Sequence, residues 1–454
     1  MILERFVSEG LAQNSYFIGS GAEAAVVDPR RDIEEYLRLA ERSQTSIRYV
    51  LETHRNEDFV VGSLELAAFT GAEILHGGQL PFAYGRAIRP SEVLAVGGLQ
   101  IKALPTPGHT DESHSFALYD ASSKGKAFAV MTGDALFVGD VGRTDFYGVP
   151  ERARLAGNLY DSLHNVLLPL GEGTLVFPAH GAGSACGESI GEREVSTIGL
   201  EKETNRWLQL SREEFIAEKM EESMERPRYF RRMEVLNLNG APLLGHLPVP
   251  RPMTSKEVEA ARDEGTYLLD VRMPYSFGGG HIAGAISIWL DGLPAYGGWD
   301  IPYDTPILLI LETQDQLNRA LRILVRLGYD NVCGYLRVGM DQYLREGRAV
   351  AGVDQVAPAE ALQMQEEGAM MMDVRDHREK HSGFIPGARE IHIGELDEML
   401  DDMDSSLRYI PFCSSGYRGN MACSMMKRKG FDNVSNLMGG FNGWKNAGMP
   451  ILRV

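Results

Sequence analysis

Four polar residues in the first half of the chain each follow an apolar run, and their side chains suit a metal ion. His54 follows "RYVLET", His109 follows "QIKALPTPG", Asp134 follows "AFAVMTG" and His180 ends "GTLVFPAH". Histidine nitrogens and carboxylate oxygens are common metal ligands. Each run reads as a strand, so a strand framework would present these four residues together at one edge. The spacing therefore predicts a metal site.

A thiol in the last quarter of the chain offers a second chemistry. The stretch "YIPFCSSGYRGNMACSMMKRKG" (409–430) predicts a strand that ends at Cys413, a loop that reaches Arg418, and a helix. Successive backbone N–H groups in such a loop form an anion-binding nest, and the helix N-terminus adds positive potential. Both lower a thiol pKa and stabilise a thiolate or a persulfide anion. Arg418 is placed to hold an oxyanion with two hydrogen bonds, and the other loop residues predicted to bind substrate are Ser414, Ser415, Gly416 and Tyr417.

Strands and helices that would position the four metal-ligand candidates alternate along residues 1 to about 240. Short apolar strands such as "EAAVVDP" follow one another with Gly-rich turns and helical stretches between them. The stretch "REEFIAEKMEESMER" (212–226) predicts a charged amphipathic helix. The proline-rich "GHLPVPRPM" (245–253) predicts a linker.

Beyond the linker the chain repeats itself with an offset of about 103 residues. "DEGTYLLDVRMPYSFGGGHIAGAISI" (263–288) is echoed by "EEGAMMMDVRDHREKHSGFIPGAREIHI" (366–393). Each copy alternates helices and strands, which predicts a small α/β domain with a mostly parallel sheet. Alignment through "DNV" places Leu311 opposite Cys413 and Gln316 opposite Arg418, so the first copy lacks a nucleophile and is expected to be inactive.

Composition limits the class of protein. A chain of 454 residues is too long for one core, so two to four domains are expected. Hydrophobic content of 44% and charged content of 24% are ordinary for a soluble globular protein. The net charge of −18 argues against nucleic acid as the main partner, because phosphate binding needs clustered Lys and Arg.

The four cysteines form no disulfide framework, so free thiols and reducing conditions are expected. Cys333 in a late strand and Cys423 in the helix after the thiol loop are both expected to be buried and inert. No stretch is apolar enough to span a bilayer, and "MILERFVSEG" lacks the order of a signal peptide. We therefore expect a cytoplasmic protein with no membrane partner.

The four strand-end residues, in this order, resemble the metallo-β-lactamase fold superfamily over about 240 residues. That family carries His-x-His-x-Asp-His where this chain reads "THRNEDF" (53–59), so Asn56 and Phe59 replace two histidines. The replacements remove the second metal of the family and spare the first. The set His54, His109 and Asp134 then remains, and two histidines with one carboxylate form the facial triad of non-haem Fe(II) oxygenases.

Within that superfamily, "GDALFVGDVGRTDF" (133–146) resembles the persulfide dioxygenases more than the glyoxalase II thioesterases. The resemblance implies one Fe(II) held by the triad, with Asn56, Asp58 and His180 orienting ligands or water around it; Asp58 alternatively caps a helix. Arg143 either meets the anionic persulfide or forms an ordinary ion pair. Cys186, six residues after His180, either holds sulfane sulfur or is a small buried residue.

The thiol loop resembles the rhodanese active site, with supporting matches in "MMDVRD", "FIPGA" and "GGFNGW". Related phosphatases use a loop one residue longer, so six residues favour sulfur over phosphorus. The inactive first copy is expected to space the two active domains or to supply an interface.

Taken along the whole chain, the order resembles the bacterial persulfide dioxygenase–rhodanese fusion proteins of sulfide detoxification. The resemblance implies a multidomain α/β fold: a metallo-β-lactamase-like αββα sandwich (1–244), a linker with an inactive rhodanese-like domain (245–350) and an active rhodanese domain (351–454). It implies oxidation of a small persulfide by O2 to sulfite, and conversion of sulfite and a second persulfide to thiosulfate at Cys413. A homo-oligomer, dimer or tetramer, is also implied.

Two other functions remain open from the sequence. The first is a zinc-dependent thioester hydrolase of the glyoxalase II type fused to an unrelated rhodanese. The second is a sulfur carrier or interaction protein without redox chemistry. The carrier thiol is open as well, since glutathione, coenzyme A, bacillithiol and cysteine persulfides all suit the site.

Overall fold

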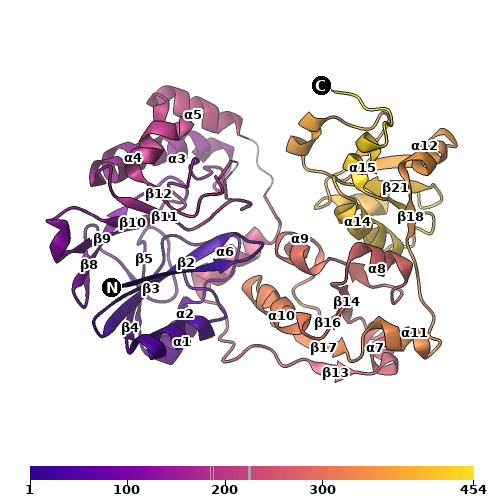
Figure 1. The fold of residues 1–454 in the computed structure, drawn as a ribbon, viewed down its shortest axis with the longest axis horizontal. Coiled ribbons are helices and arrows are strands. Elements are labelled where there is room, and N and C mark those ends of the chain that lie inside the picture. The colour runs from indigo at the N-terminus through magenta and orange to yellow at the C-terminus, as the bar shows by residue number, and fades with distance from the viewer. Residues whose placement is uncertain (185, 188, 223–225, 454) are drawn as a thin grey trace. The chain divides into compact units, whose positions relative to one another are not determined.

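A computed structural model describes residues 1–184, 186–187, 189–222 and 226–453. Over these residues the chain divides into two compact units. The first contains Met1–Leu247 with Val325–Gly328, and the second contains Pro248–Leu324 with Tyr329–Val454 (Figure 1). None of the helices in these ranges has the length and apolar character needed to cross a bilayer.

The first unit is built on two sheets, each with six strands among the described residues. One sheet has the order β1 (Ile2–Ser8), β2 (Gln13–Ser20), β3 (Glu23–Val27), β4 (Ser46–Leu51), β5 (Glu73–His76) and β6 (Arg86–Ala87). The other has the order β12 (Ser196–Thr197), β11 (Leu175–Pro178), β10 (Ala129–Gly133), β9 (His114–Asp120), β8 (Leu99–Pro105) and β7 (Val93–Val96). Both sheets mix antiparallel and parallel pairs: β3 pairs with β4 in parallel, and so does β10 with β11.

The two sheets face each other because their strands alternate apolar residues between two faces. In β2, Tyr16 and Ile18 share one buried core with Phe116 of the second sheet. Phe17, on the opposite face of β2, packs in a different core with Tyr36. Helices cover both outer faces, so the unit is the expected αββα sandwich. One face is covered by α1 (Glu34–Ser43) and α2 (Ser63–Thr70), and the other by α3 (Val149–Ser162), α4 (Ile198–Thr204) and α5 (Arg212–Glu221). The last helix of the unit is α6 (Phe230–Asn239).

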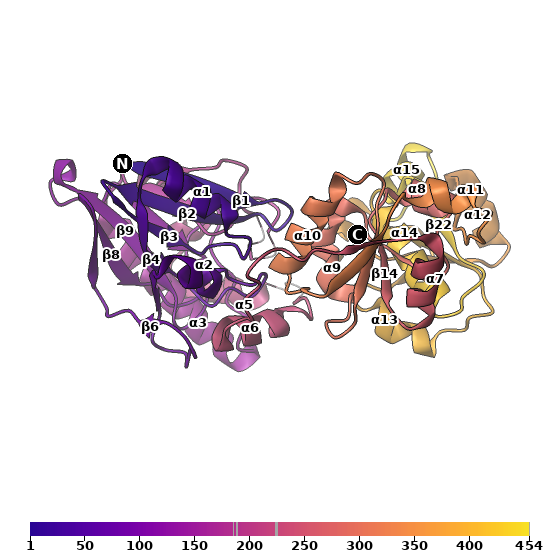
Figure 2. The same cartoon turned by 90° about the horizontal axis from the view of Figure 1, so that it is seen from below.

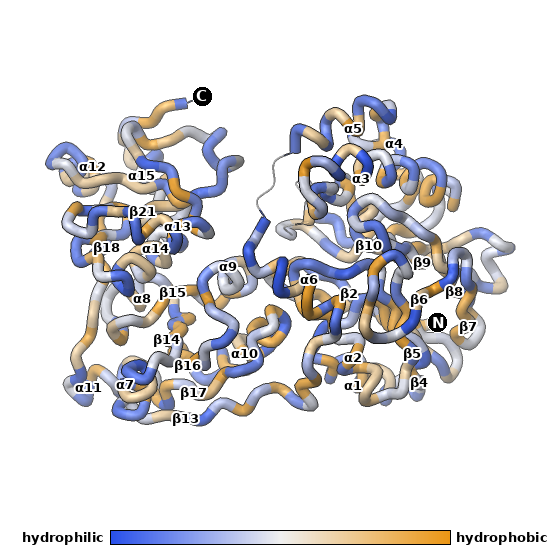
Figure 3. The backbone as a smooth tube through the Cα atoms, turned by 180° about the vertical axis from the view of Figure 1, so that it is seen from behind, coloured by the Kyte–Doolittle hydropathy of each residue, from blue (hydrophilic) through white to orange (hydrophobic). Residues whose placement is uncertain are grey.

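The charged helix predicted over 212–226 is α5, and it begins at its own capping box. The Ser211 hydroxyl caps the helix while the Glu214 carboxylate accepts from the Ser211 backbone N–H at 2.9 Å. Along the tube of α5, polar stretches are interrupted by apolar ones (Figure 3), and Phe215 is buried while Glu213 and Glu214 are exposed. It ends at Glu221, and 223–225 of the predicted stretch lie outside the described residues.

The second unit contains the two copies of the repeat. The first copy has a parallel sheet in the order β13 (Arg251–Met253), β17 (Val332–Leu336), β16 (Ile307–Ile310), β14 (Tyr267–Asp270) and β15 (Ile286–Ser287). The second copy pairs β18 (Asp354–Val356) with β22 (Ser435–Leu437), and β20 (Arg389–Glu390) with β19 (Met370–Asp373) and β21 (Tyr409–Phe412), again all parallel.

Helices surround the strands of both copies (Figure 2). Those of the first copy are α7 (Ser255–Asp263), α8 (Pro274–Gly279), α9 (Leu293–Asp300), α10 (Gln316–Arg326) and α11 (Met340–Arg345). Those of the second are α12 (Pro358–Glu366), α13 (Leu396–Met399), α14 (Tyr417–Arg428) and α15 (Gly440–Asn446).

One hydrogen-bond pattern recurs in both copies and accounts for the repeated "DVR". In the first copy, Arg272 Nη2 donates to Asp270 at 2.7 Å and to the Gly280 carbonyl at 2.9 Å. In the second copy, Arg375 makes the same bonds at 2.7 and 2.9 Å, to Asp373 and Gly383. The buried ion pair thus ties the end of a strand to the turn that follows in each copy.

The predicted linker over 245–253 is shorter than expected. Its last three residues form β13, which pairs in parallel with β17 from Arg251↔Gly334 to Met253↔Leu336. Pro252 takes part because β13 lies at the edge of its sheet, where a missing N–H is tolerated. The prolines of this stretch therefore mark an edge strand as well as a connection.

Candidate metal centre and thiol loop

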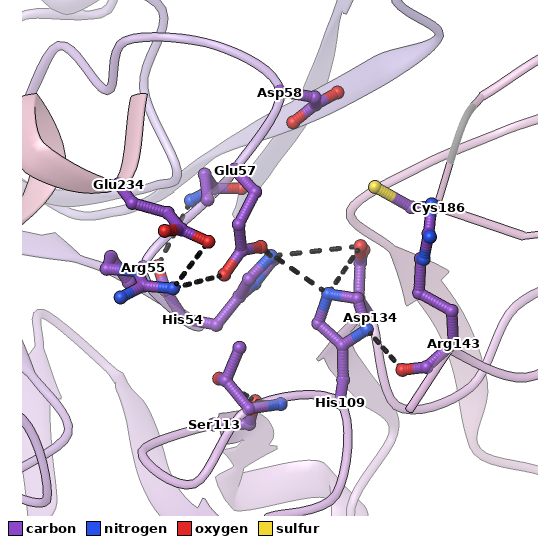
Figure 4. Close-up of polar contacts among 12 residues, drawn as sticks. His54, Arg55, Glu57, Asp58, His109, Ser113, Asp134, Arg143, Cys186 and Glu234 are labelled. Atoms are coloured by element: carbon purple, nitrogen blue, oxygen red, sulfur yellow. Dashed lines mark hydrogen bonds and ion pairs between the residues drawn. The ribbon is translucent and has the colours of Figure 1, made fainter. Parts of the chain in front are cut away.

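The ends of four strands in the first unit carry the predicted metal residues. His54 lies just after β4, His109 after β8, Asp134 directly after β10 and His180 after β11. All four side chains are buried. Figure 4 shows that His54, His109 and Asp134 point toward one another although they come from three separate strands.

Gly133 lets two of these strand ends approach closely. Its φ of +56° lies in the left-handed region, and an added Cβ would lie 2.8 Å from the Thr53 Cβ. A side chain at this position would displace Thr53, the residue before His54. Glycine is therefore required for His54 and Asp134 to share one site.

The three facing side chains each present an atom without a hydrogen-bond partner in the described structure: His54 Nε2, His109 Nε2 and Asp134 Oδ2. Asp134 Oδ2 lies 3.7 Å from His54 Nε2 and 3.4 Å from His109 Nε2. Ligands about 2.1 Å from one ion lie roughly 3 Å apart. Buried polar atoms without partners are costly, so the three residues fit a bound metal ion.

Hydrogen bonds on the far side of each imidazole turn its lone pair into the site. The His109 Nδ1 donates to the Arg143 carbonyl at 2.9 Å, so its Nε2 carries no proton in the neutral ring. The His54 Nδ1 lies 2.9 Å from the Thr53 hydroxyl, which itself donates to Asp28 at 2.6 Å. Burial lowers the pKa of His54 to about 4, so the ring is neutral and able to bind a metal.

His180 does not join the three facing side chains but lies between two carboxylates. Its Nδ1 is 2.7 Å from Asp134 Oδ1, and its Nε2 is 3.0 Å from Asp58 Oδ2. Burial alone would lower the pKa of His180, but the charges of Asp134 and Asp58 raise it well above its usual range. The ring therefore donates from both nitrogens and fixes the Asp134 carboxylate, leaving Oδ2 free to face the site.

The remaining residues of "THRNEDF" are held by local bonds. Asn56 donates from Nδ2 to the His54 carbonyl at 3.1 Å, which braces the loop. Asp58 does not cap a helix, since α2 begins at Ser63 after Gly62. Phe59 is fully buried.

Arg143 and Cys186 take positions that the sequence left open. The Arg143 guanidinium is buried and forms a two-point ion pair with Asp145 at 2.7 and 2.8 Å. Its carbonyl accepts the hydrogen bond from His109 Nδ1. The Cys186 Sγ lies within 4.8 Å of ligand atoms of Asp58 and His180, and burial raises its thiol pKa.

Glu57 is a site residue that the sequence reasoning missed. Its side chain is fully buried, and Oε2 lies 3.9 Å from His54 Nε2 and 3.7 Å from His109 Nε2 (Figure 4). Burial alone would raise the pKa of Glu57, but His109, His54 and Arg55 outweigh it and the net direction is down. The only signal in the sequence was a carboxylate three residues after His54.

The predicted thiol loop follows β21 and leads into α14. Cys413 is buried, and the Gly416 backbone N–H donates to its sulfur at 3.2 Å. The loop is held from behind, because the Phe441 N–H donates to the Cys413 carbonyl at 2.7 Å and the Asn442 N–H to the Ser414 carbonyl at 3.0 Å. An N–H aimed at the sulfur stabilises a thiolate.

Arg418, predicted to hold an oxyanion, is bound to a carboxylate of its own chain. Its Nη1 and Nη2 donate to the two oxygens of Glu379 at 2.6 and 2.7 Å, and the Ser414 hydroxyl also donates to Glu379. Burial alone would raise the pKa of Glu379, but Arg418 and Ser414 lower it to about 2. A glutamate thus takes the position that the sequence assigned to an external anion.

The first copy of the repeat contributes residues beside the thiol loop, although it has Leu311 in place of a cysteine at the matching position. Leu311, opposite Cys413, is buried, and Gln316 accepts a bond from the Glu312 N–H at 2.9 Å. Trp289 meets the Tyr417 ring edge to face with 5.1 Å between centroids. The Arg418 guanidinium carbon lies 5.9 Å from the ring centroid of Tyr296.

The other two cysteines differ in burial. Cys423 is buried inside α14, as predicted. Cys333 lies in β17 as predicted, but it is exposed rather than buried. Val332 and Gly334, on either side of Cys333, are buried. Successive residues of a strand face opposite sides, so Cys333 lies on the exposed side of β17.

Comparisons with known protein families agree with these two units. Residues 9–180 match the metallo-beta-lactamase superfamily, and residues 254–346 and 357–447 each match the rhodanese-like domain. The metallo-beta-lactamase from Staphylococcus aureus has a similar structure, with a TM-score of 0.66 and 29% identity over 74% of this chain and 98% of that one.

Curated relatives of the first unit fall into two groups. The persulfide dioxygenase ETHE1 of Bos taurus is 29% identical over 44% of this chain and 74% of its own length. The cytoplasmic hydroxyacylglutathione hydrolase of Arabidopsis thaliana is 34% identical over 36% of this chain and 60% of its own length. The chain spans only 49% of the Dictyostelium discoideum hydrolase. Similarity alone therefore does not choose between the two reactions.

Proposed function

We propose that this chain, which joins a metallo-β-lactamase-fold domain to two rhodanese-like domains, is a persulfide dioxygenase and sulfurtransferase. It would oxidise a low-molecular-weight persulfide to sulfite and then combine sulfite with sulfane sulfur from a second persulfide to give thiosulfate. The observation that carries the proposal is the convergence of His54 Nε2, His109 Nε2 and Asp134 Oδ2 while His180 is held away by Asp58.

His54, His109 and Asp134 would hold one Fe(II), in the combination that suits oxygenases. Bound Fe(II) would supply the redox chemistry that activates O2. The balanced reaction is RSSH + O2 + H2O → RSH + SO3²⁻ + 2 H⁺. The chain contributes orientation: Thr53 and the Arg143 carbonyl fix the two imidazoles, and His180 fixes the carboxylate.

Sulfur transfer would follow at Cys413. Its thiolate attacks the outer sulfur of RSSH, the S–S bond breaks, and the thiol RSH leaves with the proton. Sulfite then attacks the outer sulfur of the Cys413 persulfide, and thiosulfate leaves as the thiolate reforms. The Gly416 N–H stabilises the negative sulfur at both stages.

A second candidate function is thioester hydrolysis by a zinc-loaded first unit. Its support is the similarity to hydroxyacylglutathione hydrolases at 30% and 34% identity. Against it stands the loss of two of the histidines with which such enzymes hold a second metal, at Asn56 and Phe59. The metal bound after expression and the turnover of S-lactoylglutathione would separate the two functions.

The decisive experiment is O2 uptake by anaerobically purified, Fe(II)-loaded protein on addition of glutathione persulfide. We expect uptake that is lost in Asp134→Asn, and thiosulfate as the product. Cys413→Ser should keep the uptake and release sulfite instead. Zinc-dependent cleavage of S-lactoylglutathione without O2 uptake would establish the hydrolase, and undiminished thiosulfate from Cys413→Ser would exclude the role of that thiol.

A further inference from the structure

We infer that Glu57 is a fourth protein ligand of the metal held by His54, His109 and Asp134. The inference rests on the metal centre of the proposed function but not on which reaction that centre performs. The site would then consist of two imidazoles and two carboxylates instead of a three-residue triad.

The first support is the convergence of four orphan atoms. Glu57 Oε2 has no hydrogen-bond partner in the described structure, and the same holds for the ligand atoms of the other three residues. It lies 3.9 Å from His54 Nε2 and 3.7 Å from His109 Nε2, comparable to the 3.7 and 3.4 Å that separate Asp134 Oδ2 from the same nitrogens. Both carboxylate oxygens therefore stand in the same relation to the imidazoles.

The second support is the way the Glu57 carboxylate is anchored. Its other oxygen, Oε1, accepts a hydrogen bond from Arg55 Nη2 at 3.1 Å. The same Arg55 nitrogen lies 3.2 Å from Glu234, on α6. One oxygen is thus fixed by a cation while the other is turned inward, as Figure 4 shows. A metal-ligating carboxylate is typically oriented in this way by an outer hydrogen bond.

The third support is that the Glu57 carboxylate oxygen facing the site lacks a hydrogen-bond donor in the described structure. The far-side nitrogen of each imidazole is bonded to an oxygen, so the near-side nitrogen of each ring is the atom that faces the site. A buried carboxylate oxygen without a donor needs a positive partner, and both imidazole contacts are too long for a hydrogen bond. A divalent cation held by His54, His109 and Asp134, whose ligand atoms lie within 4.8 Å of one another, would give Glu57 Oε2 the positive partner that it lacks.

A second carboxylate would change the character of the centre. Two carboxylates neutralise a divalent ion, whereas the triad alone leaves one positive charge. Oxygen ligands favour Fe(II) and Mn(II) over softer thiophilic ions. Of about six positions on such an ion, about two rather than three remain for exogenous ligands.

The test uses the full-length protein with Mn(II) as a paramagnetic probe. Broadening of the Mn(II) electron paramagnetic resonance lines in ¹⁷O-enriched water counts bound exchangeable waters. We expect about two in the wild type and about three in Glu57→Ala. Chelator competition should show that Mn(II) and Fe(II) bind about tenfold more weakly to Glu57→Ala and to Glu57→Gln.

Glu65→Gln is the matched control, since Glu65 is also a buried carboxylate of the first unit but holds the Leu244 and Gly245 backbone N–H groups. It should keep the wild-type water count and affinity. Equal water counts and affinities in the wild type and both Glu57 variants would overturn the inference. A wild type that binds neither ion would overturn the metal centre itself, whereas a four-ligand site without O2 uptake would overturn only the dioxygenase.

Discussion

The Glu379 carboxylate lies where the thiol loop should receive a sulfur oxyanion. It binds both terminal nitrogens of Arg418 and the Ser414 hydroxyl. A charge-assisted pair of this kind must be broken or shared before sulfite can use the same donors. In the proposed sulfur transfer, Glu379 would therefore compete with sulfite for Arg418 and Ser414.

Glu379→Gln should lower the KM for sulfite in thiosulfate formation by about tenfold, the value of one charge-assisted hydrogen bond. The reason is that a neutral amide holds Arg418 less tightly than a carboxylate. Steady-state thiosulfate formation at varied sulfite concentration measures the effect. Glu390→Gln, which removes the exposed partner of Lys380, is the control and should leave KM unchanged. A raised KM in Glu379→Gln would contradict the competitor role.

The same carboxylate gives a prediction for acid stability. Its pKa falls from 4.5 to about 2 on folding, so the ionised form stabilises the native state fully above pH 4.5. That contribution is lost as the pH falls toward 2. The urea midpoints of wild type and Glu379→Gln, followed by circular dichroism, should therefore converge between about pH 5 and pH 2. A gap that widens toward low pH would show that Glu379 is protonated in the native state.

Site residues could be predicted from the sequence where they follow a regular apolar strand. His54, His109, Asp134 and Cys413 follow apolar strands, and the structure places the first three together and the fourth in a tight loop. Glu57 and Glu379 lie in irregular loop and 3₁₀ segments, where no periodicity reveals the direction of a side chain. Their roles depend on Arg55, Glu234 and Arg418, whose proximity only the fold determines.

The ends of β4 and β10 carry the metal residues, and their close approach depends on one glycine. Gly133 at the end of β10 faces Thr53, whose hydroxyl orients His54. The contact between Gly133 and Thr53 thus brings a strand end of the first sheet against a strand end of the second. Adding one methyl group at Gly133 should therefore displace Thr53 and disturb the position of His54.

Gly133→Ala should destabilise the protein by about 1–3 kcal/mol more than Gly21→Ala. The two glycines have similar φ values of +56° and +59°, but an added Cβ at Gly21 has nothing within 4 Å. The backbone strain is therefore matched, and the difference isolates the clash with Thr53. Urea unfolding and the Fe(II) content after loading measure it. Equal losses in the two variants would show that Thr53 moves aside freely.

Element boundaries in the second unit were less accessible from the sequence than its repeat. Helix and strand alternation predicted the parallel sheet, and the "DVR" ion pairs occur in both copies. The proline-rich stretch concealed β13, because an edge strand tolerates proline and a linker favours it. Cys333 was placed in the correct strand but on the wrong face, since β17 has one exposed and one buried side.

The whole chain carries two sites whose proposed reactions follow each other. In the proposed scheme, sulfite made in the first unit is the acceptor at Cys413 in the second. Covalent linkage raises the effective concentration of the second site around the first. A single chain should therefore release less free sulfite than two separate catalysts.

This expectation can be measured with two complementary variants. A freshly mixed equimolar sample of Asp134→Asn and Cys413→Ser retains one working site of each kind, but on different chains. At nanomolar protein, the mixture should release several-fold more sulfite to a trapping dye than the wild type with the same number of working sites. Equal sulfite release would mean that the intermediate travels freely through solution.

The first rhodanese-like copy has Leu311 where the second has Cys413, yet several of its side chains contact the helix that follows the thiol loop. Asn420 of α14 donates to Ser287 at 2.9 Å, and Trp289 and Tyr296 lie beside Tyr417 and Arg418. A substitution at Ser287, Trp289 or Tyr296 of the first copy should therefore disturb the thiol loop of the second, so that the first copy serves as a scaffold for its neighbour.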